Sequence, residues 1–316
     1  LGLRKLHTHV VLEMGMNAPG EIARLASIAA PGIGVITNVH PVHLEGLGTI
    51  EAVARAKAEL LQALSPDGVA IVNADDPLVL KMAEKTRARR ITFGRQPNAD
   101  VRITSMKQVA AILEVELSFH ERSLGFRLSR PGLHNAMNAA AAAAVGWVEG
   151  IDETAMEERL GKAPLPDLRM ENLRLGNGHL LVDCYNANPR SVQAALATLQ
   201  GLAGEAKHFA VLGDMRELGD ASADLHRQVG HSAAASGLHG LCAFGELAAD
   251  IAYGARANGL DEILATEDVE QAMEWARERL QKGGWVLLKG SRAMRMERIA
   301  ARLALSFGVD WREVED

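Results

Sequence analysis

The chain has 316 residues, of which 48% are apolar and 23% charged, and it carries a formal net charge of −6 with a pI near 6.0. This length exceeds what one ordinary hydrophobic core uses, so we expect two domains. The acidic balance argues against binding to a nucleic-acid backbone, and an aromatic content of 4% argues against base stacking.

No apolar run is long enough for a transmembrane helix, so we expect no membrane insertion. The two cysteines, Cys184 and Cys242, form neither a disulfide framework nor a zinc-binding pattern. Such sparse cysteine usage is typical of a reducing compartment. We therefore expect a cytoplasmic protein that does not bind nucleic acid.

The first hundred residues alternate between apolar stretches of strand length and stretches with helical periodicity. The predicted strands are 9–15 ("HVVLEMG"), 32–38 ("GIGVITN"), 68–73 ("GVAIVN") and 90–94 ("RITFG"). The predicted helices are 19–30, with Pro19 in the first turn, a helix capped by Thr49 that runs to about Leu64, and one opened by Asp76 and Pro77. Buried strands separated by helices indicate a parallel sheet.

The pattern changes after residue 100, where three stretches up to residue 128 alternate with period two and have no helices between them. We expect an antiparallel patch there, followed by an Ala-rich helix from "PGLHNAMN" and a short helix to about Leu160. Two prolines in "GKAPLPDLR" (161–169) mark the predicted domain boundary. The fold class is therefore α/β: a mainly parallel sheet with an antiparallel patch in 1–168, then a Rossmann-like α/β domain in 169–316, with a cleft between them.

Polar side chains follow two neighbouring predicted strands. Glu13 ends the first strand, and His40 and His43 lie in "TNVHPVHLEG" (37–46) after the second. Each is also typical of a solvated strand end or loop. The carboxyl ends of parallel strands meet at one sheet edge, where ligands bind. A carboxylate and an imidazole there could hold Mg²⁺, with waters and phosphates completing its shell.

Lys57 lies in the helix "EAVARAKAELL", beside its buried apolar stripe. The side chain could point toward the sheet, or it could be a boundary lysine that extends to water. Asn135 and Asn138 are three residues apart, hence on one helix face. Their amides could read an adenine edge or cap the helix, and both interpretations remain open.

In the second half, polar groups follow the predicted strands where a cleft would lie. Asp183 ends the strand in "HLLVDCYNANP", a position that commonly binds ribose hydroxyls. The segment "LGDMRELGD" (212–220) brings glycines and acids after a strand, without the spacing of a dinucleotide fingerprint. Lys289, Ser291 and Arg292 occur together in "LLKGSR" at the exit of the last strand.

These strings occur in one order that resembles a known family. "EMGMNAPGEI", "ITNVHPVHLEGLG", "ARAKAELL", "PGLHNAMNAAAA", "DCYNANPRS", "LGDMRELG" and "LKGSRAMRME" span essentially the whole chain. The set resembles the Mur ligases, which build the peptidoglycan stem peptide. "YNANP" and "LGDMRELG" favour the branch that joins D-alanyl-D-alanine to UDP-N-acetylmuramoyl-tripeptide.

The resemblance implies roles for individual residues. Glu13 and His43 would be magnesium ligands, whereas His40 is expected to be a bystander. Lys57 falls on the lysine that many Mur ligases carbamylate, which turns a cation into a catalytic, metal-binding carboxylate-like group. Arg169 would reach the ATP phosphates, although "PDLRME" departs from the usual Pro-Gly-Arg.

Further residues would contact the nucleotide or the dipeptide. Asn135 and Asn138 would face adenine, and Asp183 would hold the ribose. The residues expected near the phosphates and the incoming dipeptide are Tyr185, Asn186, Asn188, Lys289, Ser291 and Arg292. The implied reaction is ATP-driven amide synthesis through an acyl phosphate, with ATP and Mg²⁺ as cofactors and a monomeric enzyme.

A phosphate-cradling loop of the form G-x-x-x-x-G-K-[ST] does not occur in the sequence. In the family this loop precedes the equivalent of Glu13, so the chain is expected to be an inactive fragment, with the later part of the central domain and the whole C-terminal domain. A non-catalytic nucleotide-binding or regulatory module is one alternative. A Rossmann-type oxidoreductase is another, against which the absence of G-x-G-x-x-G speaks.

Overall fold

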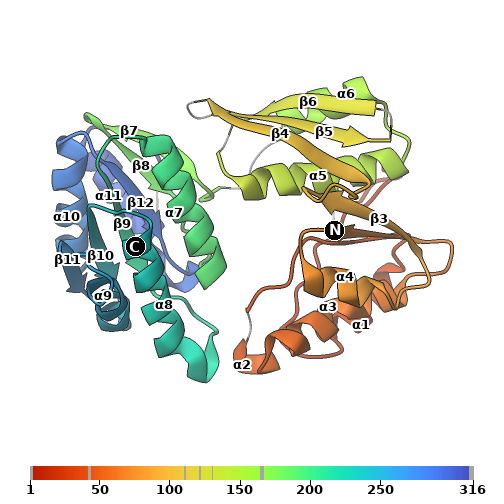
Figure 1. Cartoon of the computed structure of the whole chain (residues 1–316), viewed down its shortest axis with the longest axis horizontal. Coiled ribbons are helices and arrows are strands. Elements are labelled where there is room, and N and C mark those ends of the chain that lie inside the picture. Colours follow the sequence, from red (N-terminus) through yellow and green to blue (C-terminus); the bar gives the residue numbers. More distant parts are fainter. Residues whose placement is uncertain are drawn as a thin grey trace.

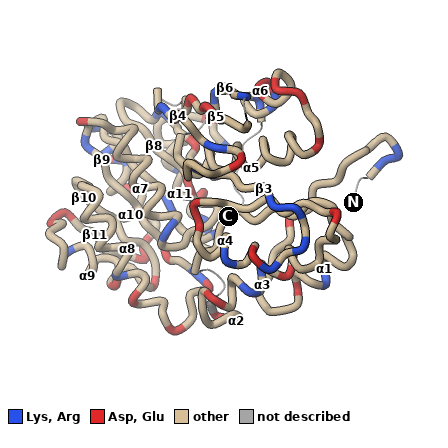
Figure 2. Tube along the Cα trace, turned by 45° about the vertical axis from the view of Figure 1, so that its right-hand side comes forward, with Lys and Arg blue, Asp and Glu red and all other residues tan. Residues whose placement is uncertain are grey.

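Two six-stranded sheets, each flanked by helices, form the framework of the protein (Figure 1). The structure is a computed structural model that describes residues 3–41, 44–109, 112–120, 122–129, 131–163 and 167–312. The first sheet has the order β1-β2-β3-β4-β5-β6 and the second has the order β11-β10-β9-β12-β8-β7. Lysine, arginine and acidic residues are interspersed over both halves of the chain (Figure 2).

The first sheet is parallel from β1 to β4 and antiparallel from β4 to β6, as the sequence predicts. Its strands are β1 (Ile33–Ile36), β2 (Val69–Asn73), β3 (Arg89–Gly94), β4 (Val101–Val109), β5 (Ile112–Phe119) and β6 (Arg122–Leu128). Its helices are α1 (Glu21–Ala29), α2 (Leu44–Leu47), α3 (Ile50–Ala63), α4 (Pro77–Ala83), α5 (Leu133–Val148) and α6 (Glu153–Gly161).

Successive side chains of β2 point to opposite faces of the sheet and pack into two separate hydrophobic cores. Val69 and Ile71 pack with α5 and the antiparallel strands, whereas Ala70 and Val72 pack with α3 and α4. Because both faces are covered, β2 is apolar at successive positions instead of alternating with polar residues. This run of apolar residues is the feature from which the sequence predicts a strand at 68–73.

The prediction of a buried strand at 9–15 is wrong. This segment has no strand, and Val10, Val11 and Leu12 are exposed, with 94% of Val11 accessible. An apolar run becomes a strand only where a neighbouring strand accepts its backbone hydrogen bonds. Among the described residues β1 pairs with β2 alone, and the segment leads away from the body of the molecule near the amino end of the chain (Figure 2).

The second sheet is parallel except for β7, which pairs antiparallel with β8. Its strands are β7 (Glu171–Leu175), β8 (Gly178–Val182), β9 (His208–Gly213), β10 (Gly240–Phe244), β11 (Ile263–Thr266) and β12 (Trp285–Lys289). Its helices are α7 (Pro189–Ala203), α8 (Ser222–Ala235), α9 (Ala248–Arg256), α10 (Val269–Gln281) and α11 (Glu297–Ser306), with 3₁₀ turns η1 (Gly219–Ala221) and η2 (Arg292–Met294). Helices α7, α8 and α9 cover one face, and α10 and α11 cover the other.

Both cysteines lie in the second sheet region and are free and buried. Burial raises the pKa of Cys184, and likewise that of Cys242, to about 12. Within the described residues, no helix combines the length and the apolarity that crossing a bilayer requires. The predicted domain boundary falls between the end of α6 and the start of β7, and residues 164–166 of that segment lie outside the described residues.

Candidate active site

The loops that follow β8, β9 and β12 enclose a pocket of about 170 Å³ at the carboxyl edge of the second sheet. This edge is where parallel α/β sheets bind ligands. The lining residues are Asn186, Ala187, Asn188, Arg216, Glu217, Leu218, Ser291, Arg292 and Ala293. The sequence had singled out Asn186, Asn188, Ser291 and Arg292 as substrate-binding, and the fold brings these four together from loops about a hundred residues apart.

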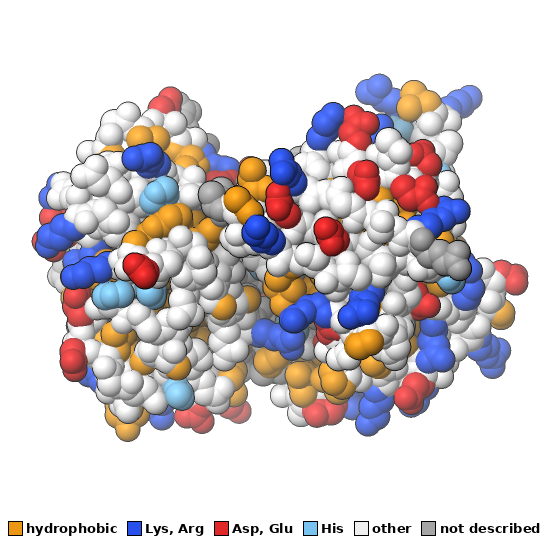
Figure 3. Space-filling model, turned by 45° about the horizontal axis from the view of Figure 1, so that its top comes forward, with side chains coloured by type: hydrophobic (Ala, Val, Ile, Leu, Met, Phe, Trp, Pro, Cys, Tyr) orange, Lys and Arg blue, Asp and Glu red, His pale blue; other side chains and the backbone are white. Residues whose placement is uncertain are grey.

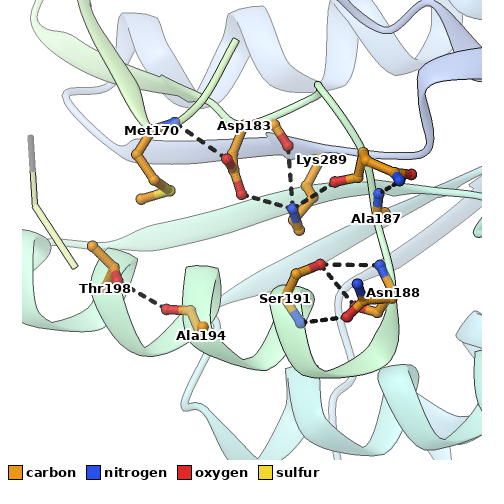
Figure 4. A network of polar contacts seen from close by, with 9 residues as sticks. Met170, Asp183, Ala187, Asn188, Ser191, Ala194, Thr198 and Lys289 are labelled. Carbon is orange, nitrogen blue, oxygen red and sulfur yellow. Dashed lines mark hydrogen bonds and ion pairs between the residues drawn. The ribbon is translucent and has the colours of Figure 1, made fainter. Parts of the chain in front are cut away.

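Lys289, also predicted to contact substrate, is not among the pocket-lining residues and lies in a buried polar network with Asp183 (Figure 4). Its side chain is 2% exposed, and its Nζ lies 2.7 Å from Asp183 Oδ2 and 2.9 Å from the Asn186 carbonyl oxygen. A third contact, at 3.4 Å, reaches the Asp183 carbonyl. With its donors directed at protein acceptors, Lys289 orients Asp183 and the loop after β8.

Asp183 stands at the end of β8 as predicted, and its second carboxylate oxygen accepts a 3.2 Å hydrogen bond from the Met170 amide. The preceding residue, Arg169, places its guanidinium 4.2 Å from the centroid of the Tyr185 ring. Leu168 and Met170, on either side of Arg169, have left-handed φ values of 60° and 51°. Such backbone strain in non-glycine residues is a feature of ligand-binding sites, and here it flanks the residue predicted to reach ATP phosphates.

Asn188 caps a helix in addition to lining the pocket. It is the N-cap of α7: its Oδ1 accepts from the Ser191 amide at 2.9 Å, while Ser191 Oγ accepts from the Asn188 amide at 3.0 Å. This reciprocal capping box satisfies two amides at the start of the helix. The Nδ2 group of Asn188 is not used by the box.

The two arginines of the pocket pair with acidic side chains. The Arg216 guanidinium lies 3.1 Å from Glu246 and 3.5 Å from Asp214, which is fully buried and accepts hydrogen bonds from the Glu246 and Leu247 amides just before α9. Arg292, at the pocket rim, pairs with Glu297 at 2.6 Å while 58% of its side chain stays exposed. Sequence reasoning assigned no role to Arg216, Glu217 or Leu218, although "LGDMRELG" carried the signal.

The start of α5 lies next to the second domain. A Cβ on Gly132, whose φ is 108°, would come within 3.3 Å of Thr198 Oγ1 on α7. The pKa of His134 is lowered by burial, and the charges of Asp183, Lys289 and Arg169 act on it as well, Asp183 in the opposite direction. His134, which the sequence interpretation passed over, therefore lies between the start of α5 and Asp183.

The two asparagines assigned to adenine differ in their surroundings. Asn135 is partly buried, and its Nδ2 donates to the Pro131 carbonyl at 2.7 Å, which closes the first turn of α5. Asn138 is exposed one turn later on the same helix. This bond of Asn135 goes to a carbonyl before the helix and caps no helix amide, and the adenine roles of Asn135 and Asn138 stay predictions.

Lys57 points back under the loop that follows β1. Its Nζ donates to the Asn38 carbonyl at 2.7 Å, so of the two orientations left open by the sequence, the one toward the sheet agrees with this contact. Burial lowers the pKa of Lys57, an effect that the negative charge of Asp76 opposes. Asp76 itself is occupied by the amides of Val39, Leu78 and Val79.

His40, expected to be a bystander, lies in the same charged environment as Lys57. Its pKa is lowered to about 4, first by burial and then by the positive charge of Arg190 at the start of α7. Arg190 belongs to the second domain, so the loop after β1 faces the helix that follows the pocket loop. The space-filling view shows the surface indented between the two halves of the molecule (Figure 3).

The predicted metal ligands are only partly placed. Glu13 is exposed in the coil that replaces the predicted strand, and His43 lies outside the described residues. Among the residues that the structure describes, no cluster of three or more histidine, cysteine or acidic side chains has metal-binding geometry. The ligand roles of Glu13, His43 and Lys57 stay predictions.

Comparisons with known proteins follow the two halves of the chain. Residues 2–146 match the Mur ligase middle domain, and residues 168–292 match the Mur ligase, glutamate ligase domain. The UDP-N-acetylmuramoyl-tripeptide–D-alanyl-D-alanine ligase of Bacillus subtilis is 33% identical over 295 residues, which cover 93% of this chain and 64% of that protein. The Escherichia coli protein of the same name is 32% identical over 96% of this chain and 67% of its own length.

Solved structures agree with the sequence relatives. MurF from Acinetobacter baumannii superposes with a TM-score of 0.86 at 29% identity, over 95% of this chain and 66% of that one. MurF ligase from Thermotoga maritima, solved in complex with ADP, gives a TM-score of 0.83 at 26% identity, over 93% and 66%. The chain thus spans about two thirds of the length of these proteins.

Proposed function

Because this chain belongs to the Mur ligase family, we propose that it supplies the nucleotide and amino-substrate sites of an ATP-dependent ligase that adds D-alanyl-D-alanine to UDP-N-acetylmuramoyl-tripeptide. The observation that carries the proposal is the pocket after β8, β9 and β12, because it gathers four side chains that the motifs had assigned to the phosphates and the incoming dipeptide. The names of the relatives support the choice of substrates.

The reaction we propose has two steps. The terminal carboxylate of the tripeptide attacks the γ-phosphorus of ATP, the bond to ADP breaks, and an acyl phosphate forms. The unprotonated amine of the dipeptide then attacks the acyl carbon, and the tetrahedral intermediate expels phosphate to leave the amide. Most of the acceleration would come from holding three substrates in line and from stabilising negative charge.

The residues of this chain would divide these tasks by position. Asn138 would face the adenine and Asp183 the ribose, with Lys289 fixing the carboxylate in place. Arg169, which stacks on Tyr185, would turn to the phosphates. The pocket would hold the dipeptide with its amine toward the junction between the domains, where closure would exclude water.

Magnesium fits the chemistry of the predicted donors. Oxygen ligands suit this hard cation, and Glu13 together with a carbamate on Lys57 would provide them, with His43 beside them. The lowered pKa of Lys57 supports the carbamate, because only a neutral amine takes up carbon dioxide. When bound, the ion would neutralise phosphate charge.

The ATP site, the cytoplasmic location and the monomeric state are part of the same proposal. The ADP complex of the Thermotoga maritima structure supports nucleotide binding. Two free, buried thiols support a reducing compartment. Sedimentation analysis would test the monomer.

The proposal is tested by phosphate release from the full-length protein with each substrate omitted in turn. We expect release only when ATP, the tripeptide nucleotide and D-alanyl-D-alanine are all present. Ala293→Leu, which fills the pocket, should raise KM for the dipeptide and leave KM for ATP unchanged, whereas Ala257→Leu, at an exposed position after α9, should change neither. Phosphate release that does not depend on the dipeptide would refute the assignment.

A further inference from the structure

The turn between β9 and η1 provides one wall of the pocket, and it is held by contacts from two other elements. Arg216, Glu217 and Leu218 line the pocket from this turn. From the β12 side, Ser291 Oγ accepts a 2.8 Å hydrogen bond from the Arg216 amide, and the Ser291 amide donates to the Asp214 carbonyl at 3.0 Å. These contacts fix one end of the turn to the opposite pocket wall.

The second support is His226, a fully buried side chain on α8. Its Nε2 accepts a 2.9 Å hydrogen bond from the Met215 amide, and its Nδ1 lies 2.7 Å from the Ser222 carbonyl oxygen. An Nε2 that accepts must carry a lone pair, so the proton is on Nδ1 and donates to Ser222. One imidazole ring therefore joins the two ends of the segment 215–222.

The turn needs such support because its backbone is strained. Glu217 has a left-handed φ of 64°, which a residue with a side chain adopts at a cost. A conformation of this kind persists only when the surroundings determine it. The residue that follows the strained position, Leu218, is buried, so a relaxed turn would move both an apolar and a charged group of the pocket wall.

Loss of His226 should act locally. Strand β9 lies between β10 and β12 and is bonded to both along its length, so its position does not depend on the histidine. The contact of His226 is to Met215, beyond the last residue of β9. The part of the molecule that the ring holds is therefore the pocket wall and not the sheet.

We propose that His226 is a positioning residue for the incoming amino substrate: it never touches the dipeptide, but it sets the turn that presents Arg216, Glu217 and Leu218 to it. The identity of this substrate rests on the proposed function. The positioning of the turn does not, because it follows from the contacts of the ring alone.

The first experiment measures amide hydrogen exchange on this chain for the wild type, His226→Leu, His226→Gln and His231→Gln. Leu removes both ring contacts, Gln keeps an acceptor for the Met215 amide, and His231 is an exposed histidine on the same helix. We expect His226→Leu to lose protection at Met215 and Arg216 while β9 and β12 stay protected, Gln to restore part of it, and the His231 variant to match the wild type. Unchanged protection at Met215, or loss across the whole sheet, would overturn the inference.

The second experiment measures kinetics in the full-length ligase. His226→Leu should lower kcat/KM for the dipeptide by roughly 10²-fold, the scale of an ångström-sized displacement, with KM for ATP nearly constant. Gln should recover part of the loss. Equal changes in both KM values would overturn the positioning role. A wild-type enzyme without dipeptide-dependent turnover would instead refute the proposed function, and the exchange experiment would still decide the role of His226.

Discussion

The side chain of Lys57 makes a short hydrogen bond and has a lowered pKa. It donates to the Asn38 carbonyl at 2.7 Å, and burial lowers its pKa. A buried ammonium next to a bound cation would be repelled, whereas a carbamate would attract it. We therefore expect Lys57→Ala to lower kcat of the full-length enzyme by roughly 10²-fold or more, as for loss of one preorganised electrostatic contact.

The informative variant at this position is Lys57→Arg. A guanidinium keeps its positive charge and cannot form a carbamate, so this variant should fail as well. Activity is measured at saturating ATP, with carbon-13 NMR of bicarbonate-treated protein to detect the carbamate directly. Wild-type turnover in Lys57→Arg would return Lys57 to the role of a boundary lysine.

His40 predicts an acid-sensitive contribution to stability. Burial, followed by the charge of Arg190, lowers its pKa from 6.5 to about 4, with Asp76 opposing and Lys57 reinforcing the shift. The unfolded chain thus takes up a proton near pH 6.5, and the folded one only near pH 4. Between these values the unfolded state binds more protons, so stability should fall as the pH is lowered, with no further loss from this group below pH 4.

Urea unfolding of the wild type and His40→Gln across this interval tests the assignment. The stability of the variant relative to the wild type should rise as the pH falls from 6.5 to about 4. Parallel curves over the same range would mean that His40 has no such role.

The sequence identified part of the candidate site and missed the rest for a physical reason. Asn186, Asn188, Ser291 and Arg292 lie in the loops that follow β8 and β12, so strand order and direction suffice to gather them. His226 lies in the middle of a helix, and only the packing of α8 brings its ring to Met215. Periodicity marks such a histidine as a core position but does not give its partner.

Helix α7 begins at the pocket, so its capping residue Asn188 also lines the pocket. Asn188→Ala should lower the free energy of unfolding by about 1 kcal/mol through loss of the cap. Asn188→Asp should keep the cap, because a carboxylate also accepts from the Ser191 amide.

The same pair of variants separates the cap from substrate binding. If the Nδ2 group of Asn188 contacts the dipeptide, Asn188→Asp should raise KM for it without loss of stability in urea. A wild-type KM in that variant would restrict Asn188 to its capping role.

At the scale of the elements, the sequence predicted helix ends correctly where a residue nearby in the chain supplies the hydrogen-bond partner. Thr49 and Asp76 cap α3 and α4 as their sequences indicate. Strand β7 was missed although Leu173 and Leu175 alternate with polar residues in "ENLRL" and Gly176 and Asn177 form a two-residue hairpin turn before β8. The prediction of a strand at 9–15 was wrong because a strand needs a neighbouring strand to pair with. Hydrophobicity along the chain does not show whether the tertiary structure provides one.

At the scale of the whole molecule, we expect the two domains to change their relative orientation about the segment 164–169. Within the described residues the domains meet where the start of α5 lies against α7 and where α2 lies beside η1. Relative motion is the usual behaviour of two domains unless their interface is large and hydrophobic. Of the two left-handed residues that flank Arg169, Leu168 lies within this segment and Met170 directly follows it, and a change of backbone conformation there would relieve strain.

Small-angle scattering of this chain with and without Mg-ATP tests the hinge. Nucleotide that binds both Asn138 and Asp183 should favour a more compact average shape, whereas the free protein should require an ensemble. A single rigid, closed shape that fits both data sets would count against a hinge.

The burial of the two cysteines makes this motion directly measurable. With pKa values of about 12, Cys184 and Cys242 carry almost no thiolate at neutral pH and are shielded from reagents. Cysteines introduced at exposed positions, such as Lys85 in one domain and Gln281 in the other, would therefore take up fluorophores or spin labels selectively. Cys184 and Cys242 therefore need not be replaced before label-to-label distances between the domains are measured.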